Sequence, residues 1–77
     1  MPAYQISFLR AVCMGETHFN AQQVVAEYGL GAARTITKNK KTLVERDFIE
    51  KSGDGFKMVD PVFELWFKRE YCNILPQ

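Results

Sequence analysis

Apolar residues recur at one-face helical spacing in two stretches near the start of the chain. In residues 3–14 the spaced positions are Phe8, Leu9, Val12 and Cys13. In residues 20–31 they are Ala21, Val24, Val25 and Tyr28. Asn20 is a candidate N-cap for the second helix, and Gly29 is placed to end it in a left-handed conformation. We therefore predict two short helices, with Leu30 buried in the tight turn that follows.

The pattern in residues 32–46 predicts a third helix with one apolar face and one basic face. Its inward positions are Ala33, Ile36, Leu43 and Val44, and Lys40 falls on the same stripe. A lysine can occupy such a position because its long stem lies along apolar surface while the amine reaches water. The opposite face carries Arg34, Thr35, Thr37, Lys38 and Lys41. This helix therefore combines a side that packs on a core with a side that carries positive charge.

Two short apolar runs flank the turn sequence Ser52-Gly53-Asp54-Gly55 and predict a β-hairpin over residues 48–59. The apolar positions are Phe48, Ile49, Phe56, Met58 and Val59. Gly53 and Gly55 are expected to have φ angles that are positive or nearly so, because tight turns favour glycine there.

A last helix is predicted over residues 60–72. Asp60 can cap it, and Pro61 falls at its first position, where the missing N–H costs nothing. Apolar side chains cover more than half of its circumference, namely Val62, Phe63, Leu65, Trp66, Phe67, Tyr71 and Cys72. A helix that is apolar nearly all round is normally buried on more than one side.

The order of these elements defines the expected fold. Two helices joined by a glycine-containing turn are the signature of a helix-turn-helix. A hairpin directly after the third helix makes it a winged one, with the hairpin as the wing. We therefore predict an α+β fold: a winged helix-turn-helix with a three-helix core, a two-stranded β-wing and a C-terminal helix, forming a single domain over residues 1–77.

The composition is that of a small globular domain. The 77 residues are 47% hydrophobic and 25% charged, which is ordinary for such chains. No apolar run approaches the ~20 residues of a membrane span, and no secretion signal is recognisable, so we expect a cytoplasmic location. Cys13 and Cys72 have no metal-ligand spacing and are expected to be reduced, and His18 is expected at the surface. Neither a metal nor a cofactor is expected.

Positive charge is concentrated in one segment. Residues 32–46 contain five basic residues and one acidic residue, a net charge of +4, whereas the whole chain carries +1. The remainder therefore carries −3. The basic face of the third helix is thus set apart from a mildly acidic surrounding.

Residues 28–71, "YGLGAARTITKNKKTLVERDFIEKSGDGFKMVDPVFELWFKREY", resemble the winged-helix segment near the C-terminus of the archaeal-type P-loop ATPases. These are AAA-like ATPases that are also widespread in bacteria. The shared pattern is a Leu-Gly before the recognition helix, then an acid-Pro and an aromatic F-x-L-W-F helix. It appears here as Leu30-Gly31, Asp60-Pro61, Phe63, Leu65, Trp66 and Phe67. The resemblance extends over roughly residues 6–72 and implies an ATPase as the parent protein.

The chain departs from this pattern and from winged helices in general at several points. Many winged helices have Gly where Asp47 stands and Leu where Lys40 stands. No Gly-x-x-x-x-Gly-Lys-Ser/Thr loop occurs in the 77 residues, so the chain lacks the phosphate cradle of a P-loop enzyme. No Ser/His/Asp or Cys/His arrangement can be placed either. We therefore expect no enzyme activity in this chain, which resembles an excised C-terminal domain or a small stand-alone relative.

Two functions are compatible with this sequence, and the first is binding of double-stranded DNA. The helix over residues 32–46 would enter the major groove, and the wing over residues 48–59 would contact the backbone. The candidate residues are Arg34, Thr35, Thr37 and Lys38 near bases, Lys41 nearer phosphate, and Lys51 and Lys57 on the wing. The alternative interpretation of the helix is a solvated basic face.

The second function is regulatory docking or dimerisation through the last helix. The candidate surface consists of Val62, Phe63, Trp66, Phe67 and Tyr71. Its partner would be the rest of the parent ATPase or a second copy of the chain. Of the pairs Phe63/Phe67 and Val62/Trp66, we expect one to pack on the first helix near Phe8 and Val12 and the other to face outward. The alternative is that these aromatic residues only complete a thin core.

Overall fold

The computed structural model describes residues 1–72 of the chain, which form four helices and one antiparallel hairpin. The elements are α1 (Ala3–Cys13), α2 (Gln22–Tyr28), α3 (Ala33–Glu45), β1 (Ile49–Ser52), β2 (Gly55–Met58) and α4 (Pro61–Tyr71). Each predicted helix and the predicted hairpin is present, in the predicted order. The α+β winged-helix fold is thereby confirmed.

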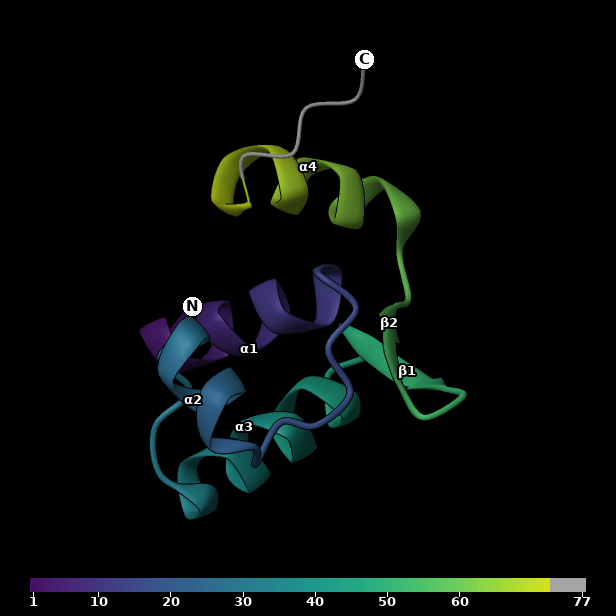
Figure 1. The fold of residues 1–77 in the computed structure, drawn as a ribbon. Helices are drawn as coiled ribbons and strands as arrows, with labels where there is room; N and C mark the ends of the chain where they lie inside the picture. The colour runs from purple at the N-terminus through teal and green to yellow at the C-terminus, as the bar shows by residue number, and fades with distance from the viewer. Residues whose placement is uncertain (73–77) are drawn as a thin grey trace.

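Helix α1 is the central element of the domain. It packs against α2, α3, β2 and α4, and among the described residues α3 and α4 do not contact each other. Figure 1 shows α4 on one side of α1 and α3 on the other, with the hairpin beside them. This placement follows from four buried side chains of α1: Phe8, Leu9, Ala11 and Val12. The outer surfaces of α3 and α4 therefore lie on different sides of the molecule.

A single apolar cluster connects the elements. Its largest fully buried side chains are Phe8, Leu9, Leu30, Ile36, Leu43, Ile49 and Phe67. Leu30 is buried in the turn between α2 and α3, as predicted, because Gly29 has a φ of 67° and turns the chain sharply after α2.

The start of α2 differs from the prediction. The helix begins at Gln22 with Ala21 as N-cap, and no side chain caps it. Asn20 lies one residue too early for this role, because residues 18–21 form a turn in which the N–H of Ala21 donates to the carbonyl of His18 at 3.1 Å. The assignment of Asn20 as N-cap was therefore wrong.

The buried stripe of α3 is rotated relative to the prediction. Ile36 and Leu43 are buried as expected, but Ala33 is exposed and Val44 is 40% exposed. Asn39, on the other side of the Ile36–Leu43 line, is only 8% exposed. Lys40 is half-buried, in keeping with a stem that lies along apolar surface.

The hairpin has a two-residue loop, Gly53-Asp54, and pairs Ile49 with Met58, Lys51 with Phe56 and Ser52 with Gly55. Gly53 has the expected positive φ, at 57°. Gly55 does not have a positive φ, so that part of the prediction was wrong. A Cβ at Gly55 would instead lie 3.0 Å from Cγ2 of Thr17. Glycine is needed there because the hairpin approaches the segment after α1 closely.

Helix α4 begins as predicted. The Oδ1 atom of Asp60 accepts hydrogen bonds from the N–H groups of Val62, at 2.9 Å, and Phe63, at 3.4 Å. Pro61 is the first helical residue. These local signals fix the direction in which α4 leaves the hairpin and crosses α1.

Candidate nucleic-acid interface

The outer face of α3 carries a compact group of cations. At ~100° per residue, Arg34, Lys38 and Lys41 fall within about 60° of one another on the helix surface. All three are exposed, because α3 packs on α1 through Ile36 and Leu43 on its opposite side. Among the described residues none of the three forms a salt bridge. Their ammonium and guanidinium groups are therefore available to an anionic partner.

The two candidate threonines of α3 lie beside this group. Thr37 is exposed, whereas Thr35 is half-buried. The Cγ2 atom of Thr35 lies 3.4 Å from the position of a Cβ built on Gly31, so this side chain is close to the turn before α3. The structure thus places Arg34, Thr37, Lys38 and Lys41 on the open surface, and Thr35 at its edge.

An acidic residue limits the basic face at its C-terminal end. Glu45 is exposed and follows Lys41 by one helical turn, in the same angular sector. Positive charge is consequently highest over the first turns of α3. These are the turns that a helix-turn-helix protein inserts into the major groove.

The two candidate lysines of the wing lie on opposite faces of the hairpin. Lys57 is paired with Glu50 at 3.5 Å, and both side chains are more than half exposed. Exposed pairs of this kind contribute only ~0–1 kcal/mol, so Lys57 can exchange its partner readily. Lys51 is opposite Phe56 in the register and therefore shares the face on which Ile49 and Met58 enter the core.

Lys40 joins Lys51 at the corner between α3 and the wing. The Nζ atoms of Lys40 and Lys51 lie 5.9 and 5.5 Å from the centre of the Phe56 ring. Phe56 packs in turn on Phe19, with 6.1 Å between ring centres. Lys40 was not among the predicted contact residues. The sequence showed only that Lys40 is a lysine on an otherwise apolar stripe. It could not show which residues surround Lys40, because they come from other segments of the chain.

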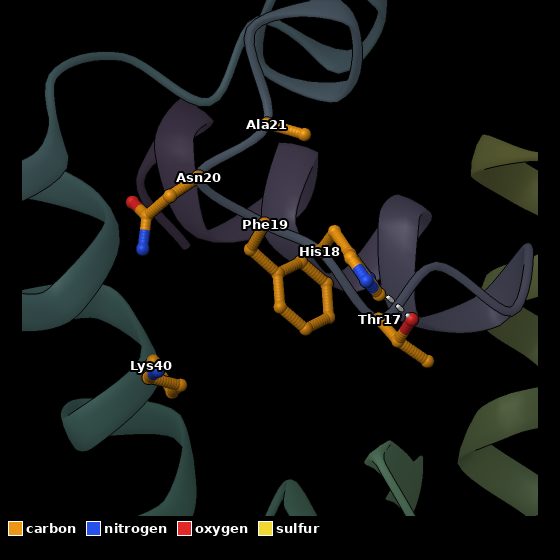
Figure 2. Close-up of a pocket in the computed structure, with 6 residues that line it drawn as sticks. All are labelled: Thr17, His18, Phe19, Asn20, Ala21 and Lys40. Carbon is orange, nitrogen blue, oxygen red and sulfur yellow. Dashed lines mark hydrogen bonds between the residues drawn. The ribbon is translucent and has the colours of Figure 1, made fainter.

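A hollow of about 480 Å³ adjoins this corner. It is lined by Thr17, His18, Phe19, Asn20, Ala21 and Lys40. Figure 2 shows Lys40 on α3 across the hollow from the segment after α1, with the Phe19 ring between them. The Oγ1 of Thr17 and the Nδ1 of His18 are 3.0 Å apart. His18 is exposed, so the hollow combines one lysine with polar groups that solvent can reach.

The candidate interaction surface on α4 divides into an inner and an outer part. Phe67 is 1% exposed and belongs to the core, so it is not available to a partner. Phe63 is half-buried and lies with its ring centre 5.4 Å from that of Phe48. Val62 is 75% exposed and Trp66 is 45% exposed. The outward pair is thus Val62/Trp66, and Leu65 and Tyr71 extend the same exposed apolar surface.

Two side chains that belong neither to α3 nor to the hairpin have shifted pKa values. Burial raises the pKa of the Cys13 thiol to about 12, and the neighbouring Cys72 thiol adds to the rise. Burial and a 3.0 Å hydrogen bond from the Tyr28 hydroxyl to Glu16 raise the pKa of Tyr28 to about 12. Both groups stay neutral near pH 7, so neither is an activated nucleophile.

The helix-turn-helix formed by α2 and α3, followed by a β-hairpin, places this chain in the winged-helix class of domain. The family model described as "Probable winged helix domain" matches residues 1–69. The chain therefore belongs to this family. Searches of curated proteins and of solved structures found no significant match. Within residues 1–72, no helix is long and apolar enough to cross a membrane.

Proposed function

We propose that this domain binds double-stranded DNA, with α3 in the major groove and the wing on the phosphate backbone. The observation that supports it most is the compact, exposed group formed by Arg34, Lys38 and Lys41 on the outer face of α3, which makes no salt bridge within residues 1–72. A winged-helix domain presents this face of its third helix to DNA.

The proposed contacts follow the position of each side chain along α3. Arg34, Thr37 and Lys38 are nearest the N-terminal end, from which a recognition helix reaches base edges. Lys41 lies one turn further on and is assigned to phosphate. Lys51 and Lys57 would contact the backbone from the wing, and Thr35 would act from the edge of the helix.

A salt titration of duplex-DNA binding tests this function. Each lost phosphate contact lowers the slope of log K against log salt by about 0.9. Lys38→Ala combined with Lys41→Ala should weaken binding and flatten the slope. Arg34→Ala should also change sequence preference, at a cost of ~1–3 kcal/mol if the guanidinium contacts a base.

Arg69→Ala is the matched control, because it removes one exposed cation from α4, on the other side of α1. It should leave the affinity and the slope nearly unchanged. Fluorescence anisotropy with a labelled duplex measures all four proteins. If the unsubstituted domain bound no duplex DNA at low salt, the proposed function would be wrong.

We further propose that the domain belongs to a P-loop ATPase of the archaeal type. The support is the sequence pattern Leu30-Gly31, Asp60-Pro61 and the aromatic run of α4. In this proposal the ATPase activity resides elsewhere in the parent, and this chain performs no catalytic step. The full reading frame of the gene is the test, since a Walker A loop upstream of Met1 is expected.

A second candidate function is docking or dimerisation through α4, without DNA binding. It is favoured by the exposed apolar surface of Val62, Leu65, Trp66 and Tyr71. The partner would be a second copy of the chain or the remainder of the parent protein. Self-association together with an absence of duplex binding at low salt would favour this function over the first.

A further inference from the structure

The inner face of the hairpin continues beyond the core and meets α3. Ile49 and Met58 are buried on this face, and the next pair outward is Lys51 opposite Phe56. Phe56 is half-buried because one side of its ring packs toward Phe19. The inner face therefore ends in a corner between α3 and the hairpin, where Lys40 and Lys51 lie at the ring of Phe56.

Two ammonium groups share the Phe56 ring. Lys40 reaches it from α3 and Lys51 from β1, at 5.9 and 5.5 Å from the ring centre. An ammonium group at this distance from an aromatic ring is attracted by the ring's quadrupole. Among residues 1–72 neither lysine forms a salt bridge. Two like charges are thus held at one ring without an acidic partner, an arrangement that an anion between them would stabilise.

The adjoining hollow provides space for an anion beside Lys40, whereas Lys51 is not one of its lining residues and would reach the anion from outside it. Lys40 is part of its wall, and Thr17, His18 and Asn20 supply side chains that can donate hydrogen bonds. Figure 2 shows these groups and Lys40 on opposite sides of the hollow. The beginning of β2 lies close to one lining residue, since Gly55 approaches Thr17. The corner is therefore bounded by residues 17–21 as well as by the two lysines.

We propose that this corner is a phosphate-binding site, in which Lys40 and Lys51 bind one phosphate together, and that its occupant is a backbone phosphate of the DNA duplex. The choice of DNA as the source of the phosphate rests on the proposed function. The site extends the DNA contact from the outer face of α3 to the segment 17–21. It also assigns a role to Lys40, which occupies a position where an apolar residue would pack more easily.

The first test is the salt dependence of duplex binding in Lys40→Met, Lys51→Met and the double variant. Methionine keeps an apolar stem and removes the charge. Because both lysines serve one phosphate, the double variant should lower the slope by about 0.9, the value for one contact, and not by about 1.8. Arg69→Met on α4 is the control and should keep the full slope.

Phe56→Leu provides a separate test, because it removes the ring and keeps every charge. It should weaken duplex binding and leave the slope nearly unchanged, because both lysines still carry their charge but are no longer attracted by the ring. Circular dichroism checks that the variant is folded. If duplex binding occurs and none of the lysine variants changes the slope, or if the double variant loses about 1.8, the shared site is wrong while DNA binding stands.

A titration with inorganic phosphate tests the site independently of DNA. Amide resonances of Lys40, Lys51, Phe56 and residues 17–21 should shift, and Lys40→Met with Lys51→Met should abolish the shifts. If the domain binds no duplex but shows these shifts, the proposed function fails and the site takes phosphate from a small molecule. If it shows neither, both proposals are overturned.

Discussion

Asp47 has a left-handed backbone conformation directly after α3. Its φ is 60°, and it is the only residue other than glycine with a positive φ in residues 1–72. Asp tolerates this conformation better than most residues, and β-branched residues resist it strongly. We expect Asp47→Val to lower the free energy of unfolding by ~1–3 kcal/mol and Asp47→Gly to leave it equal or higher. Urea denaturation measures both.

Asp47→Ala is the control for the loss of the carboxylate, and its stability should fall between those of the Gly and Val variants. Equal stability of all three variants would contradict the argument. The sequence indicated this position only as one where many winged helices have glycine. The structure supplies the reason, which is the turn that leads from α3 into the wing.

Tyr28 connects the end of α2 to the segment after α1 through its hydrogen bond to Glu16, at 3.0 Å. The pKa of Tyr28 is raised from 10.0 to about 12, first by burial and then by this bond. A folded-state pKa above the ordinary value means that the folded protein retains the proton longer than the unfolded chain. The contribution of Tyr28 to stability is therefore complete below about pH 10 and is lost as the pH rises through about 12.

Tyr28→Phe isolates this contribution. At about pH 8 the variant should be less stable by ~1 kcal/mol, because the hydroxyl–carboxylate bond is missing. At about pH 11 the difference in the free energy of unfolding should be smaller, since only the wild-type protein has an ionisable hydroxyl at residue 28. Cys13 titrates in both proteins and cancels in the comparison. A difference that grows with pH would contradict this assignment.

At the scale of elements, the hairpin depends on the close approach of Gly55 to Thr17. A Cβ at Gly55 would lie 3.0 Å from Cγ2 of Thr17, a distance at which one of the two must move. We expect Gly55→Ala to cost ~1–3 kcal/mol through overpacking. Thr17→Ser removes Cγ2 and keeps the hydroxyl, so the double variant should recover much of the loss. A double-variant cycle by thermal denaturation would contradict the argument if the two costs simply added.

Most of the fold could be predicted because element boundaries are determined by local chemistry. Gly29, Gly53 and the pair Asp60-Pro61 act within a few residues, so each is recognisable without tertiary contacts. The rotation of α3 could not be predicted in this way. Whether Asn39 or Val44 is buried depends on where α1 and the hairpin pack, and helical spacing alone allows either.

The same distinction applies to the candidate site. Arg34, Lys38 and Lys41 are grouped by a single helix, so their spacing in the sequence is sufficient to place them together. Lys40 and Phe56 meet only because the wing folds back onto α3, and no local pattern encodes this contact. The structure therefore adds the corner, and it places the predicted residue Thr35 at the edge of the outer face of α3.

At the scale of the whole molecule, α1 separates two surfaces of different character. The outer face of α3 is basic, whereas the outer face of α4 carries Val62, Leu65 and Trp66 beside one cation, Arg69, and the two helices do not touch within the described residues. A partner on α4 would thus leave α3 accessible (Figure 1). Substitutions on α3 are accordingly expected to affect DNA binding, and substitutions on α4 to affect self-association.

The last prediction concerns self-association through α4. Val62 and Trp66 face outward, and isologous pairing of two α4 helices about a two-fold axis is the simplest closed way to cover them. We expect wild type to dimerise in sedimentation equilibrium, and Val62→Glu with Trp66→Glu to be monomeric and still folded. Val44→Glu, at an exposed valine of α3, is the control and should still dimerise.

The inward side of α4 should behave in the opposite way. Phe67 is fully buried, so Phe67→Ala should cost ~3–5 kcal/mol. That loss is comparable to the whole stability of a domain of this size, and the variant should be largely unfolded by circular dichroism. Because neither outward side chain belongs to the buried core, the acidic variant should remain folded while its apparent mass halves. A wild-type domain that stays monomeric at high concentration would contradict pairing through α4, and it would leave the exposed surface of Val62 and Trp66 to a different partner.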